Sequence, residues 1–87
     1  MTKTKNPLTV WIYNFCRTKG PDANPADAWR YISEIAPQHN VFPWLVRFDP
    51  EAGEVVYKPS PIAPERRISR ASFRRQLLRA RQLAGFG

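Results

Sequence analysis

The sequence contains few of the residues on which catalysis and metal binding usually depend. Its 87 residues include one cysteine, Cys16, and one histidine, His39. A lone cysteine excludes an intramolecular disulfide and a zinc site built from thiolates, and it favours a reducing compartment. We expect Cys16 to be a small buried hydrophobic residue. This inventory predicts no catalytic residue, no metal site and no cofactor, and therefore a protein that is not an enzyme.

Glycine-rich loops and long hydrophobic runs are also missing. With four glycines in total, the chain has no Gly-rich phosphate-binding loop. The apolar run that starts at Leu8 is short and lacks a small-residue cleavage site, and no other run is long enough to cross a bilayer. We therefore expect a cytoplasmic protein with no membrane contact.

Acidic residues are scarce as well. Seven Asp and Glu stand against 14 Lys and Arg, which gives a net charge of +7 and a pI near 10.3. Eight of the basic residues lie from Lys58 onward. Such clustering favours a patch that binds a polyanion over an even coat of charge that only keeps the protein soluble.

Bulky apolar side chains, in contrast, suffice for one core. Hydrophobic residues make up 43% of the chain and aromatic residues 13%, with three tryptophans. A chain of this length cannot enclose two separate cores. We predict a single α+β domain over residues 1–87, with two N-terminal helices, a β-hairpin and a basic C-terminal helix around one small core.

The first ordered element is expected to be a helix that ends at the Gly20-Pro21 pair. Residues 1–6 are polar and charged, so we predict a flexible N-terminus there. From Leu8 the apolar residues recur at helical spacing, although the β-branched and aromatic content would also suit a strand. Glycine followed by proline is a typical end of a helix.

The second helix has the clearest start signal in the chain. Asn24 can act as the N-cap, and Pro25 is suited to the first helical position. We predict a helix from Pro25 to about Ala36, ended by Pro37. Its inward face should carry Trp29, Ile32 and Ala36.

Two short β-prone runs follow within residues 42–57 and flank the turn-rich residues 49–53, which predicts a β-hairpin. An isolated hairpin is marginally stable in water, so its apolar face should pack on the helices. Three prolines within residues 59–64 predict an extended, stiff connector to the basic C-terminal segment.

The last segment, residues 66–84, is predicted to be an arginine-rich helix. Ser69 or Ser72 can cap it, and Gly85 and Gly87 can end it. At helical spacing one narrow apolar stripe should face the core, formed by Phe73, Leu77, Ala80 and Ala84.

The stretch from Arg66 to Leu77 resembles the second half of a helix-turn-helix. In that family a hydrophobic residue and a serine open the recognition helix, and a later aromatic or β-branched residue and a leucine dock it on the core. The resemblance implies a helix that contacts DNA. Prolines stand upstream where the first helix and its turn belong, so we expect an unrelated scaffold to present this helix: Pro59, Pro61 and Pro64.

Seven arginines of this segment are the predicted nucleic-acid contacts. Arg70 and Arg74 lie one helical turn apart and are the first choice for base edges, because guanidinium groups fit the edge of guanine. The others are expected to contact phosphates: Arg66, Arg67, Arg75, Arg79 and Arg81. The predicted function is nucleic-acid binding in a regulatory or accessory role, with DNA favoured over RNA.

Three other interpretations stay open from the sequence. The arginines could merely face water on a helix that closes the core. The protein could instead be an interaction module, such as a small inhibitor or adaptor, that presents Arg74 and the anchor Trp44 to an acidic surface of a larger enzyme or ribonucleoprotein. Exposed Tyr31 or Tyr57 could also stack on RNA bases.

Overall fold

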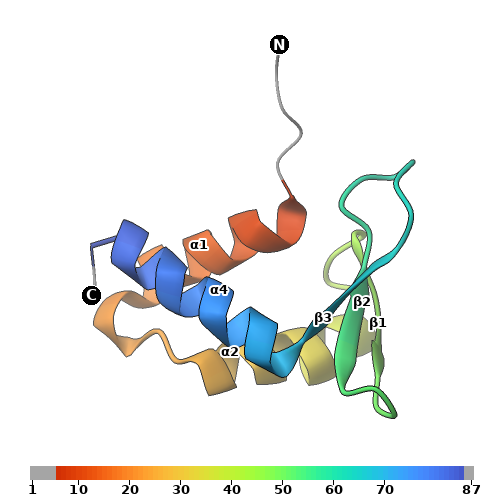
Figure 1. Ribbon diagram of the computed structural model, residues 1–87, viewed down its shortest axis with the longest axis horizontal. Helices are drawn as coiled ribbons and strands as arrows, with labels where there is room; N and C mark the ends of the chain where they lie inside the picture. The colour runs from red at the N-terminus through yellow and green to blue at the C-terminus, as the bar shows by residue number, and fades with distance from the viewer. Residues whose placement is uncertain (1–5, 86–87) are drawn as a thin grey trace.

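The computed structural model describes residues 6–85 and combines helices with a small antiparallel sheet, which confirms the predicted α+β class (Figure 1). The described residues do not include Gly87 or residues 1–5, which make up most of the predicted flexible N-terminus. The elements in chain order are α1 (Pro7–Lys19), the 3₁₀ turn η1 (Gly20–Asp22), α2 (Pro25–Arg30), the π-helical segment η2 (Tyr31–Ile35), α3 (Ala36–Gln38), β1 (Leu45–Asp49), β2 (Glu54–Tyr57), β3 (Arg66–Ser69) and α4 (Arg70–Leu83).

The first element is a helix and not a strand. The side chain of Asn6 accepts a hydrogen bond from the backbone N–H of Leu8 at 3.0 Å, so Asn6 is the N-cap of α1, and Pro7 occupies the first helical position. Gly20 follows the helix with a φ of 60°, which a residue with a side chain rarely adopts. The buried face repeats every four residues and consists of Leu8, Ile12 and Cys16.

The second helix begins as predicted but runs past the proline that was expected to end it. Asn24 caps α2 by accepting a hydrogen bond from the N–H of Ala26 at 2.8 Å. The predicted stop at Pro37 is wrong, because the helix widens into η2 and then continues as α3 to Gln38. Pro37 cannot donate a backbone hydrogen bond to this continuous helix, and the π-helical widening directly before it is where the helix accommodates the proline.

The predicted hairpin is confirmed, but it is part of a three-stranded sheet with the order β1-β2-β3. The prediction that Arg66 to Ser69 are helical is wrong, since these residues form β3 and pair with β2 in antiparallel register, with Val55 opposite Ile68. The prediction of an extended connector is wrong, because residues 59–63 form bends and turns, with the N–H of Ala63 donating to the carbonyl of Ser60 at 3.2 Å. The connector turns the chain back and places a third strand. A paired β3 satisfies the backbone groups of β2 that a two-stranded hairpin would leave open.

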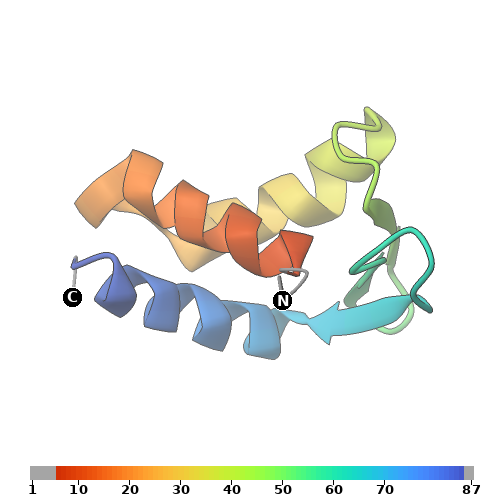
Figure 2. The ribbon, with the colours of Figure 1, turned by 90° about the horizontal axis from the view of Figure 1, so that it is seen from above.

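The core lies where α4 packs across α1 and α2, with the sheet at one end (Figure 2). Three of the four residues predicted for the stripe on α4 are buried, with Phe73 and Leu77 fully covered and Ala80 nearly so. The fourth, Ala84, is the half-buried C-cap that follows the helix. The ring of Phe73 meets that of Trp29 edge to face, with 5.3 Å between their centroids. Such an arrangement stabilises an aromatic pair beyond its burial.

Cys16 completes this core as a buried residue, as predicted. Its thiol lies 3.6 Å from the carbonyl oxygen of Leu77 and donates a weak hydrogen bond to it. Burial raises the pKa of Cys16, and the nearby charge of Arg81 acts in the opposite direction. A thiol with a raised pKa is a poor nucleophile, which fits a packing role.

The packing of α4 predicts a large difference between two leucines of the same helix. Leu77→Ala removes a side chain with no exposed surface and should lower the free energy of unfolding by about 2–5 kcal/mol, because a cavity is left in the core. Leu83→Ala is the matched control, since Leu83 is 71% exposed and its loss should change stability by under about 0.5 kcal/mol. Urea unfolding monitored by tryptophan fluorescence measures both. Equal effects of the two substitutions would contradict the described packing.

Candidate nucleic-acid interface

Helix α4 is the centre of the candidate interface. Of the two serines expected as caps, Ser69 has that role, because its hydroxyl oxygen accepts a hydrogen bond from the N–H of Ser72 at 3.2 Å. The 14 residues of α4 include no carboxylate and five arginines: Arg70, Arg74, Arg75, Arg79 and Arg81. The helix follows β3 without an intervening loop, so a paired strand and a packed stripe both fix its position.

No helix or strand formed by residues 6–85 covers the outer side of α4. Figure 2 shows α4 along one edge of the described part of the chain, with α1 and α2 on the opposite side. Four arginines of the helix are exposed: Arg70, Arg74, Arg75 and Arg79. The sequence therefore places four permanent positive charges on one accessible helix.

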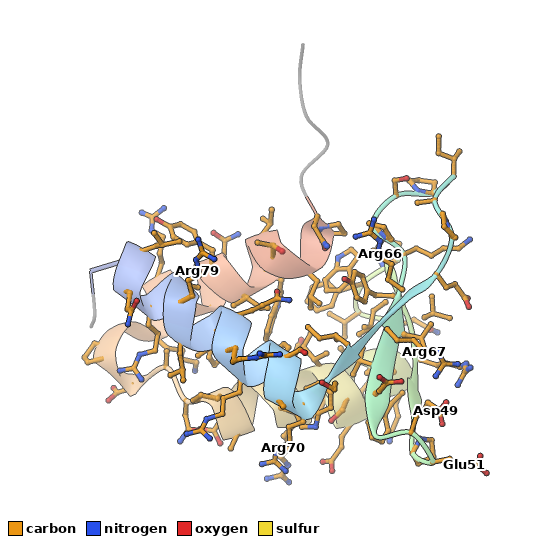
Figure 3. All side chains as sticks on the ribbon, in the orientation of Figure 1. Asp49, Glu51, Arg66, Arg67, Arg70 and Arg79 are labelled. Carbon is orange, nitrogen blue, oxygen red and sulfur yellow. The ribbon has the colours of Figure 1, made fainter. Side chains whose placement is uncertain are left out.

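Arg70 and Arg74 lie on the flank of α4 that faces α2. Both line a shallow concavity of about 420 Å³ whose other walls are Asn24, Pro25 and Ala26. Arg70 extends outward from the first turn of α4 (Figure 3). The structure thus brings the two predicted base-contact residues together, at the junction between two helices.

Arg75 and Arg79 occupy other positions around the same helix. A terminal guanidinium nitrogen of Arg75 donates a hydrogen bond to the hydroxyl of Ser72 at 3.2 Å, which restricts the side chain while leaving most of its donors free. Arg79 lines a second groove, of about 380 Å³, between α4 and the α1 residues Thr9 and Tyr13 (Figure 3).

Arg67 forms ion pairs with carboxylates of the sheet. Its guanidinium donates to a carboxylate oxygen of Asp49 at 2.8 Å, and Glu54 lies 3.7 Å away (Figure 3). The hydrogen bond from Arg67 lowers the pKa of Asp49, and the same contact raises the pKa of Arg67. Two carboxylates therefore offset this charge, whereas its neighbour Arg66 is exposed and forms no salt bridge among residues 6–85.

Arg81 is also engaged within the fold. It is half-buried and donates a hydrogen bond to the backbone carbonyl of Pro21 at 3.4 Å, while its Nε atom is buried without a partner among the described residues. This contact links the end of α4 to the turn between α1 and α2. Arg81 therefore supports the fold, and the predicted phosphate contact there loses its geometric basis.

The remaining charge on α4 has no local counterpart. Within residues 6–85 the salt bridges join Arg30 to Glu34 and Arg67 to Asp49 and Glu54, and none involves an arginine of α4. Asp49 and Glu51 belong to the β1–β2 turn at the sheet end of the molecule (Figure 3). The exposed face of α4 consequently keeps its full positive charge.

Trp44, the predicted anchor for a protein partner, is half-buried directly before β1. Its ring stacks on that of Phe42 with 4.9 Å between centroids. It lines a groove of about 560 Å³ whose other walls are Pro7, Pro43, Lys58, Pro59, Ser60 and Pro61. Trp44 and Arg74 therefore line separate concavities, and the structure does not join them in one site.

The two tyrosines considered for base stacking differ in accessibility. Tyr57 is 6% exposed, and its hydroxyl lies 3.4 Å from the amide nitrogen of Asn6, so its ring is not available to an external base. Tyr31 is half-buried and already stacks on Trp11, with the two rings 6° from parallel.

Searches with the chain found no matching protein family, no matching curated protein and no matching solved structure. Along residues 6–85, no helix has the length and apolar character needed to span a membrane. The same part of the chain holds no group of three or more His, Cys, Asp or Glu side chains that could bind a metal ion.

The ion pair of Arg67 predicts a pH dependence of stability. The pKa of Asp49 is lowered in the folded protein, so the ionised carboxylate stabilises the fold at neutral pH. This contribution is lost as the pH falls through the folded-state pKa. Asp49→Asn should therefore be less stable than the unsubstituted protein at neutral pH, and the difference should shrink toward zero in acid, once the pH is below the lowered folded-state pKa of Asp49.

Urea unfolding at both pH values measures this difference. Glu51→Gln is the control for loss of one negative charge, because Glu51 lies in the same turn and forms no salt bridge within residues 6–85. If Asp49→Asn lowers the stability by the same amount at neutral and at low pH, the charge of the carboxylate is not what stabilises the fold.

Proposed function

We propose that this protein binds nucleic acid, duplex DNA before RNA, through the exposed face of α4, in a regulatory or accessory role. The observation that carries the proposal is the set of four exposed arginines on a helix without any carboxylate. Binding to phosphates would release condensed counterions, which supplies a sequence-independent gain in affinity. The net charge of +7 adds a longer-range attraction to the same partner.

The shape of α4 also suits a DNA groove. An α-helix with its side chains is about 10–12 Å across, and the major groove of B-DNA is about 12 Å wide. Because α4 lies along one edge of the molecule, α1 and α2 would stay behind it while it enters the groove (Figure 2). Arg66 precedes the helix on β3 and extends the basic surface beyond its N-terminus.

Loss of one of these charges should weaken binding to all sequences. Arg79→Gln should lower affinity for random-sequence duplex and reduce the slope of log K against log salt by about 1. Arg30→Gln is the matched control, because Arg30 is exposed on α2 and paired with Glu34 at 3.3 Å. The control removes the same unit of charge from a position outside α4, so its affinity and salt slope should change much less than those of Arg79→Gln.

Fluorescence anisotropy with labelled duplex at about 50 and 200 mM salt measures both quantities. Single-stranded and duplex RNA of the same sequence serve as competitors. If the protein binds no duplex even at the lower salt, DNA is excluded as the partner. Equal losses for Arg79→Gln and Arg30→Gln would show that net charge, and not α4, determines binding.

A second candidate function is protein interaction, because Trp44 borders an apolar groove lined with prolines and Lys58. Tryptophan and arginine are both favoured in interface hot spots. A small inhibitor or adaptor of this kind would contact an acidic surface on a larger enzyme or ribonucleoprotein. A complex that survives nuclease treatment and is lost with Trp44→Ala would favour this function, whereas a complex lost with nuclease would favour the first.

A further inference from the structure

We infer that Arg75 and Gln82 are the residues of α4 that read base edges, and that Arg70 and Arg74 contact the DNA backbone instead. The inference rests on the proposed function and reassigns the roles that the sequence suggested. It follows from where each side chain lies around the helix relative to the buried stripe.

The outermost line of α4 consists of four residues at spacings of four, three and four: Ala71, Arg75, Leu78 and Gln82. At about 100° per residue these spacings follow one line along the helix. The line runs roughly opposite the buried stripe, whose fully covered members are Phe73 and Leu77. Side chains on it point away from the protein, and they would reach the floor of a groove first.

Arg70 and Arg74 do not share this direction. They lie closer to the buried stripe, and both line the concavity shared with Asn24 and Pro25 of the neighbouring helix. A helix that enters a major groove places such flanking residues at the rim, where the phosphates lie. Their position therefore suits backbone contacts.

The opposite flank of α4 is basic as well. Arg79 lines the groove between α4 and Tyr13, and the guanidinium of Arg17 lies 5.9 Å from the centre of the Tyr13 ring. Positive charge thus lies on both sides of the outermost line. A major groove has a phosphate backbone along each of its edges, so the distribution of charge matches the shape of the ligand.

The chemistry of the outermost line suits direct base reading. An arginine can donate two hydrogen bonds to the O6 and N7 atoms of guanine, and a glutamine can pair with the N6 and N7 atoms of adenine. The hydrogen bond from Arg75 to Ser72 limits its rotamers before binding, which reduces the entropy lost on contact. Leu78 is 38% exposed between them and could contact a thymine methyl group.

The spacing of the two readers sets an expected pattern in the DNA. Arg75 and Gln82 are seven positions apart, which in a helix corresponds to about 10 Å, or about three base pairs. We therefore expect a preferred sequence with a guanine and an adenine about three base pairs apart. Ala71 at the N-terminal end of the line is small enough to let the backbone approach the bases closely.

Selection of binding sites from a randomised duplex pool tests this assignment. The unsubstituted protein should enrich a sequence of that kind. Arg75→Lys keeps the positive charge but loses the planar fork, so it should bind random duplex with roughly unchanged affinity and salt dependence. Its preference for the selected sequence over random duplex should fall by about tenfold or more.

Gln82→Ala should lose the preference for adenine at its position in the selected sequence and keep the preference for guanine. Arg74→Lys is the matched control on the flank, and it should keep the selected sequence. Thermal unfolding midpoints verify that each variant folds, which is expected because all three side chains are exposed.

The outcomes separate this inference from the proposed function. No binding of any duplex by the unsubstituted protein would overturn both. Binding without an enriched sequence, or a preference that survives Arg75→Lys and disappears with Arg74→Lys, would overturn the inference and leave DNA binding standing.

Discussion

The burial of one stripe of α4 against α1 and α2 is the interaction on which the rest of the structure depends. Phe73 and Leu77 have no exposed surface, and the rings of Trp11 and Trp29 lie around Phe73. Two fully buried side chains of this size account for several kcal/mol of stability, which is a large share of what a small domain has. The same contact fixes which side of α4 faces solvent, so the core determines the geometry of the candidate interface.

The sheet contributes to this arrangement through β3. Because β3 pairs with β2 and runs directly into α4, the backbone ladder sets the start of the helix, while the contact of Arg81 with Pro21 holds its other end. Arg67 adds a link across the sheet to Asp49. Two of the arginines in this segment thus stabilise the scaffold that presents the others, although all of them look alike in the sequence.

Local signals in the sequence predicted much of the fold, and non-local pairing accounts for what they missed. The cap at Asn24, the stripe on α4 and the hairpin were predicted because each depends on residues close together in the chain. The strand β3 was missed because its four residues become a strand only by pairing with β2. The roles of Arg67 and Arg81 depend on partners 18 and 60 residues away, and no local pattern reports such contacts.

The charge on α4 acts against the stability of the helix that carries it. Arg70 and Arg74 form a like-charged pair at a spacing of four residues, as do Arg75 and Arg79, and each such pair costs about 0.2–0.5 kcal/mol. The first turn of α4 contains no acidic residue, and Arg70 lies there beside the positive end of the helix dipole. Local rules of helix stability therefore do not explain these arginines, whereas a bound polyanion would remove both penalties at once. Residues that lower the stability of their own helix are expected where function, and not folding, determines the residue type. The exposed arginines of α4 are residues of this kind.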